Sequence, residues 1–184
     1  LKPSKKSGGS GAGQMKMLRR LPKILKLIPG KSQDLRAWFL SMQYWLGGSD
    51  DNTESLVRFL ISRYSSRAEW RGVKAAEPIE YPETGLYHPD LPDHHIAANI
   101  ADLPRKGTGP TIGVLMLRSY ILAGDTAHYD HVIRSFEARG MNVIPAFAGG
   151  LDGRPAIDAY YLGTIDALVS LTGFSLVGGP AYND

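Results

Sequence analysis

Apolar residues recur with helical spacing over the first third of the chain. They stand at positions 15, 17, 18, 21, 24, 25 and 28, and again at 35, 38, 39, 42, 45 and 46. Recurrence at i, i+3, i+4 and i+7 predicts amphipathic helices over residues 15–28 and 33–46. Pro22 is expected to kink or divide the first helix, and Ser32 is expected to cap the second.

A third helix is predicted near residues 53–64, with Asp50 or Asp51 as its N-cap. The second helix is rich in aromatic side chains. Such a stripe at helical spacing favours a packed core, with a flat pocket for an aromatic macrocycle as the alternative. The four aromatic residues concerned are Trp38, Phe39, Tyr44 and Trp45.

Residues 65–110 show little periodicity of any kind. They are rich in Pro, Gly and His, and long segments without their own pattern usually connect or wrap other elements. We interpret them as a long connection with one short helix near 93–101.

From Thr111 onward, short apolar runs alternate with helical patterns. This alternation predicts right-handed crossovers in a parallel sheet, and strands so apolar should be covered on both faces. We therefore expect an α/β fold, a partial open parallel βαβαβ sheet preceded by a small helical segment. The predicted strands are 111–117, 142–147 and 166–171, and the predicted helices are 126–139 and 155–161.

These patterns divide the chain into four parts. A flexible linker rich in Ser, Gly and Lys is expected over 1–14, a helical segment over 15–66, the connection over 67–110 and the partial α/β domain over 111–184. A Gly-Gly-Pro turn follows the last predicted strand, and such a turn normally leads into another element. The α/β domain is therefore expected to be truncated at its C-terminal end, in a piece of a longer protein.

Composition excludes several kinds of site. The 184 residues include no Cys, which excludes a disulfide framework, a thiolate zinc site and a Cys nucleophile. The net charge is +3, but it is unevenly distributed. Residues 1–36 carry ten Lys or Arg and one acidic residue, whereas residues 37–184 carry eleven Lys or Arg and seventeen acidic residues. The basic segment is interpreted as a solvated helix and linker, or as a surface for an anionic partner. Bases crowded at one end do not indicate a nucleic-acid-binding face.

The chain contains no apolar stretch near the ~20 residues that a membrane span needs, and no secretory leader opens it. A cytoplasmic protein is therefore expected. Peripheral contact of the basic amphipathic helix with a membrane is kept as an alternative.

Candidate binding residues follow the predicted strands, because ligands of open parallel sheets bind beyond the carboxyl ends of strands. Arg118 follows the first strand and can hold a ligand carboxylate or pair with Asp125. The turn Gly149–Gly150 follows the second. Asp125, with His128 and His131 one turn apart on a helix, is a weak candidate set for a divalent metal. No Walker or Rossmann fingerprint occurs, so ATP is not expected to bind this chain.

Several segments together resemble one family. The phrases GLYHP, LRSYILAGDTAHYDHVI, VIPAFAGGLDGRPAI and VSLTGFSLVGGPAYND are similar to the large H subunit of magnesium chelatase, especially its bacteriochlorophyll type, which is related to the cobaltochelatase large subunit. The resemblance implies insertion of Mg²⁺ into protoporphyrin IX for (bacterio)chlorophyll synthesis. It also implies AAA+ partner subunits I and D that hydrolyse ATP, in the cytoplasm or, in a plant or alga, the chloroplast stroma.

The resemblance also limits what this chain can do. The family's HFGTHGSLEF segment has no counterpart here, so no catalytic residue is carried over and the chain alone is not expected to catalyse. Arg118, His128, Gly149 and Gly150 are our candidates for lining the porphyrin cavity. Two alternatives are kept: a non-catalytic α/β interaction module with a basic docking segment, and the cobaltochelatase-type homologue of cobalamin synthesis.

Overall fold

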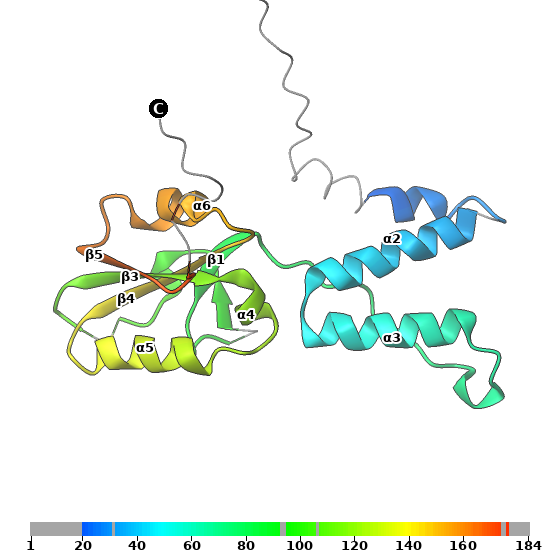
Figure 1. The fold of residues 1–184 in the computed structure, drawn as a ribbon, viewed down its shortest axis with the longest axis horizontal. Coiled ribbons are helices and arrows are strands. Elements are labelled where there is room, and N and C mark those ends of the chain that lie inside the picture. Colours follow the sequence, from blue (N-terminus) through cyan, green and yellow to red (C-terminus); the bar gives the residue numbers. More distant parts are fainter. Residues whose placement is uncertain (1–19, 31, 93–94, 106, 174–175, 177–184) are drawn as a thin grey trace, which may run out of the picture. The chain divides into compact units, whose positions relative to one another are not determined.

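The computed structural model describes residues 20–30, 32–92, 95–105, 107–173 and 176. The predicted linker, the start of the first predicted helix and most residues after 173 lie outside this part of the chain. Contacts divide the protein into two compact units, Leu1–Glu80 and Tyr81–Asp184. Figure 1 shows the first as helical and the second as a sheet with helices on it.

The first unit contains the predicted helices. Residues 20–25 are helical on both sides of Pro22, so this proline does not end the helix. The predicted cap of the third helix is corrected. Ser49 is the N-cap, since its hydroxyl accepts a hydrogen bond from the Asn52 amide, and the two aspartates occupy the first turn. The remaining elements are α2 (Ser32–Gly47), α3 (Asp50–Tyr64) and η1 (Ala68–Trp70).

The apolar faces of these helices are only partly covered by other residues. The prediction that the aromatic side chains of the second helix form a packed core is therefore wrong for most of them. Trp38 is 54% exposed and Trp45 is 68% exposed, whereas Tyr44 is buried. On α3 the buried residues are the polar Asn52 and Ser55. Among the described residues, the apolar side chains of α2 are therefore exposed over much of the helix.

The second unit is built on a five-stranded sheet of order β2-β1-β4-β3-β5. Its three parallel strands confirm the predicted α/β class. Two antiparallel strands were not predicted, and both fall in the stretch interpreted as a connection. The strands are β1 (Thr84–Tyr87), β2 (Ile96–Ala97), β3 (Thr111–Leu117), β4 (Asn142–Ala148) and β5 (Ala167–Ser170).

Helices cover both faces of the sheet, as its apolar strands require (Figure 1). Along β3, Val114 and Met116 pack with the α5 side chains on one face, and Leu115 packs with the α6–η4 side chains on the other. Within the described residues, no helix has the length and hydropathy of a membrane span. The helical elements are η3 (Ile100–Asp102), α4 (Arg118–Leu122), α5 (Ala127–Glu137), α6 (Arg154–Ala156) and η4 (Ile157–Tyr161).

Candidate functional site

Arg118 is the first residue of α4 and lies at the carboxyl end of β3, as predicted. Its guanidinium donates hydrogen bonds to the carbonyls of Pro82 (2.7 Å) and Tyr81 (3.1 Å). The carboxylate of Glu83 lies 3.9 Å from it. These contacts attach the start of α4 to the segment that leads into β1.

The turn Gly149–Gly150 lies beside the same segment. The amide of Gly149 donates to the carbonyl of Glu83 at 2.7 Å. A Cβ at Gly149 would collide with a Glu83 carboxylate oxygen and would stand 3.6 Å from Cδ of Arg118. Gly150 has a φ of +71°, a conformation that favours glycine. The structure therefore brings Arg118 and Gly149 together around Glu83, an acid that sequence reasoning did not single out.

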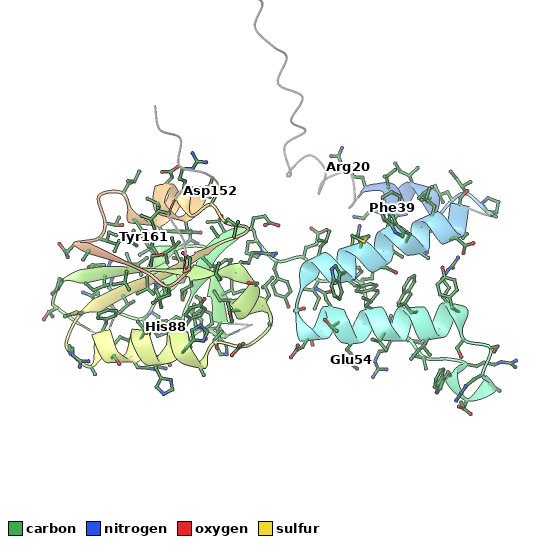
Figure 2. All side chains as sticks on the ribbon, viewed as in Figure 1. Arg20, Phe39, Glu54, His88, Asp152 and Tyr161 are labelled. Carbon is green, nitrogen blue, oxygen red and sulfur yellow. The ribbon has the colours of Figure 1, made fainter. Side chains whose placement is uncertain are left out.

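The cavity at this edge is small. Gly150, Asp152 and Thr172 line it together with β3 side chains, and its volume is about 10 Å³. A space of that size holds about one water molecule. In this lining, Asp152 (labelled in Figure 2) accepts three hydrogen bonds from the exposed guanidinium of Arg154. Among the residues that the structure describes, this edge therefore does not enclose a macrocycle.

The candidate metal ligands do not converge. The ring of His128 lies tilted against that of Tyr129, with 3.9 Å between centroids, and meets the ring of Tyr120 edge to face at 5.3 Å. His131 directs Nδ1 to the carbonyl of Ala127 at 2.6 Å. Across the described residues, no group of three His, Asp or Glu side chains is placed to hold a metal ion.

A buried polar network around His88 was missed by sequence reasoning (Figure 2). His88 is wholly buried, and its Nε2 lies 2.9 Å from a carboxylate oxygen of Glu137 on α5. Its Nδ1 accepts a hydrogen bond from the amide of Asp90 at 3.1 Å. Arg134 bridges the carboxylates of Asp90 and Glu137. The sequence contained one indication of this network. Residues 130, 134 and 137 are charged and stand at helical spacing, so they share one side of the predicted helix.

Tyr87 extends this polar face toward the start of α5. Its hydroxyl donates to the carboxylate of Asp130 at 2.6 Å. The pKa of Tyr87 is raised from 10.0 to about 12, mainly by burial of the phenol and secondly by its hydrogen bond to that carboxylate. The neutral phenol is thus the form that the fold stabilises, which suits a structural hydrogen-bond donor.

Tyr87→Phe is expected to change how stability depends on pH. Because folding raises the pKa of Tyr87, its contribution is complete below pH 10 and is lost as pH rises toward 12. The variant should lose about 1.5–3 kcal/mol at neutral pH, the contribution of a hydrogen bond to a charged group. The free energy of unfolding of the variant should then decline less steeply above pH 10 than that of the wild type. Urea unfolding at a series of pH values measures both effects, with the exposed Tyr120→Phe as control; parallel curves would contradict the prediction.

Comparison with known proteins bears on the whole chain. A family model described as CobN/Magnesium Chelatase matches residues 42–184, and one described as a domain of unknown function (DUF3479) matches residues 1–39. The chain is 69% identical to the magnesium-chelatase H subunit of Cereibacter sphaeroides over 98% of its own length. It is 37% identical, over its full length, to the chloroplastic magnesium-chelatase H subunit (ChlH) of Oryza sativa subsp. indica.

The chain spans only 16% of the Cereibacter subunit and 14% of the rice subunit. Among solved structures, the catalytic subunit of cobaltochelatase from Mycobacterium tuberculosis matches with a TM-score of 0.50 and 23% identity. That match covers 89% of this chain and 14% of the other, and it concerns the fold. The resemblance found in the sequence is thereby confirmed, and the chain belongs to the CobN/magnesium chelatase family.

Proposed function

We propose that this chain is a segment of the H subunit of a magnesium chelatase, which holds protoporphyrin IX while Mg²⁺ is inserted. The 69% identity to the Cereibacter subunit over 98% of the chain carries the proposal. Because the chain spans 16% of that subunit, we assign the reaction to the whole subunit and no catalytic residue to this segment.

The chemistry defines what the whole subunit must supply. Mg²⁺ prefers oxygen ligands and loses water reluctantly, while the macrocycle needs a broad apolar pocket with cations for its two propionates. We propose Arg118, His128, Gly149 and Gly150 as part of one wall of that pocket. The small size of the cavity beside Gly150 means that other parts of the subunit must complete it.

The partners and compartment in this proposal follow from the family. AAA+ subunits I and D hydrolyse the ATP, and this chain contributes none of the nucleotide-binding motifs sought in its sequence. The complex works in the bacterial cytoplasm or, for a plant or algal source, in the chloroplast stroma.

A chimaera tests the proposed function. The matching segment of the Cereibacter subunit is replaced by this chain, and Mg²⁺ insertion into deuteroporphyrin is followed by fluorescence with subunits I, D and ATP. We expect a rate within about tenfold of the parent, a barrier change of no more than about 1.4 kcal/mol. A chimaera active with Co²⁺ alone would favour the cobaltochelatase alternative. A folded chimaera inert with both metals would contradict the proposal and favour an interaction module.

A further inference from the structure

The first unit buries a different side of α2 from the one that carries its large apolar residues. Helices α2 and α3 lie side by side (Figure 1). The buried residues of α2 are Ala37 and Tyr44. The ring of Tyr44 lies 5.9 Å from that of Phe59 on α3, and its hydroxyl donates to the carbonyl of Ala76 at 2.5 Å, in the extended segment 73–80. This buried side therefore attaches α2 to the rest of its unit.

The exposed apolar side chains of α2 lie on the other side of the helix. At 3.6 residues per turn, they fall within about a third of the circumference, roughly opposite Ala37 and Tyr44. Both tryptophans are more than half exposed. Several large apolar side chains exposed together mark interaction surfaces more often than free surface. We call this set the tryptophan face, and it consists of Leu35, Trp38, Trp45 and Leu46.

The tryptophan face is poor in charge. Residues 37–49 contain no Lys, Arg, Asp, Glu or His. Enrichment in Trp together with loss of charged residues is typical of the centre of a protein–protein interface. A helix that lies on a membrane surface instead carries Lys and Arg along its polar side, and Arg36 is the one cation of α2. The composition therefore fits the apolar surface of a protein.

The length of the relatives indicates which protein surface this is. The chain aligns over 98% of its own length but spans 16% of the Cereibacter subunit, so most of such a subunit lies outside these residues. The two family matches, residues 1–39 and 42–184, also meet within α2. Trp38 lies in the first match and Trp45 in the second. The tryptophan face thus runs along a helix that joins two regions of a much longer chain.

We infer that the tryptophan face is a docking surface for another domain of the same H subunit, which covers it with an apolar surface of its own. The inference rests on the proposed function, because it takes the chain as a segment of that subunit. Trp38 and Trp45 are the anchors of the contact, since a few aromatic residues at the centre of an interface carry most of its binding energy.

Hydroxyl-radical footprinting read by mass spectrometry tests the inference, because it reports the accessibility of each tryptophan separately. The purified chain, at a concentration where sedimentation shows a monomer, is compared with the chimaera described above. We expect oxidation of Trp38 and Trp45 to be slower in the chimaera by about fivefold or more, because the centre of an interface excludes water. The matched control is Trp70 in η1, outside the tryptophan face, which should react alike in both.

A double variant provides a second measurement. Trp38→Gln/Trp45→Gln should raise the rate at which a protease cleaves the chimaera by about tenfold or more, because cleavage follows the population in which the domains are apart. Cleavage of the isolated chain should change much less, since no other domain covers the face there. Trp70→Gln is the control and should change neither rate.

Four outcomes would overturn the docking surface. Equal oxidation of Trp38 and Trp45 in chain and chimaera would leave the face in solvent, and protection only by added anionic phospholipid vesicles would identify a membrane contact. Equal protection in the monomeric chain would show that the chain's own residues cover the face. Protection only where the chain dimerises would identify a second copy.

The same chimaera separates this inference from the proposed function. A chimaera that inserts Mg²⁺ while both tryptophans of the face stay reactive would reject the docking surface and leave the function intact. An inert chimaera in which they are protected would reject the function and retain the docking surface.

Discussion

His88→Ala is expected to lower the free energy of unfolding by about 3 kcal/mol or more, because it leaves the buried carboxylate of Glu137 without the ring as a hydrogen-bond donor. The ring of His88 is wholly buried and lies 2.9 Å from the carboxylate of Glu137, which is itself 6% exposed. Without the ring, that carboxylate keeps the partly exposed Arg134 at 3.3 Å but loses its buried donor. Urea unfolding of the purified chain at neutral pH measures the loss.

The direction of the hydrogen bonds refines this prediction. Nδ1 of His88 accepts from the amide of Asp90, so the proton of the neutral ring is on Nε2 and is donated to Glu137. His88→Gln, which retains an amide donor, should lose less than His88→Ala. The control is His131→Ala on the exposed side of α5, expected within about 0.5 kcal/mol of the wild type. Equal losses from His88→Ala and His131→Ala would contradict a stabilising role for the buried pair.

Two of the three parallel strands, β3 and β4, were predictable because each is seven residues long and almost continuously apolar. Residues 111–117 form β3 with the predicted bounds, and β4 exceeds the prediction by one residue. Strand β1 was not predictable by the same signal. It has four residues between Pro82 and Pro89, and it is buried on both faces, so it shows neither alternation nor length. Pairing with β4, about sixty residues later, makes it a strand.

For the helices of the first unit, the sequence predicted the elements but not which side chains are buried. Periodicity located α2 and α3 correctly, but it identifies only the face that is able to be buried. Trp38 and Trp45 lie on that face and remain exposed, while Tyr44 is buried against the extended segment. The same holds for Arg118 at the candidate site, whose position was predictable and whose contacts were not. Its place after β3 was predictable, whereas its partners lie 36 and 37 residues earlier in the chain.

Phe147→Ala is expected to cost about 3–5 kcal/mol, as removal of a buried aromatic ring usually does. Phe147 is wholly buried in β4, within the cluster that also holds Tyr129 and Ile133 of α5. Its cross-strand partner in β1 is Gly85. Denaturant unfolding measures the loss, and Phe147→Leu, which keeps more of the volume, should be less destabilising and provides a folded reference.

The pairing with Gly85 makes the effect of Phe147 testable by a double-mutant cycle. A Cβ at Gly85 would stand 2.7 Å from the Phe147 ring, so Gly85→Ala alone should cost about 1–3 kcal/mol through overpacking. Combined with Phe147→Ala, the new methyl enters space that the ring has left. The double variant should therefore lose less than the sum, by about 0.5–3 kcal/mol.

The control for this cycle is Gly113→Ala, whose new methyl would meet Ile165 at 2.8 Å on the opposite face of the sheet. Its cost should add to that of Phe147→Ala within about 0.5 kcal/mol, because the two sites share no contact. Additivity with Gly85→Ala as well would show that the ring does not cover that glycine. Coupling with Gly85→Ala alone would place the unpredicted strand β1 in direct packing contact with the predicted core.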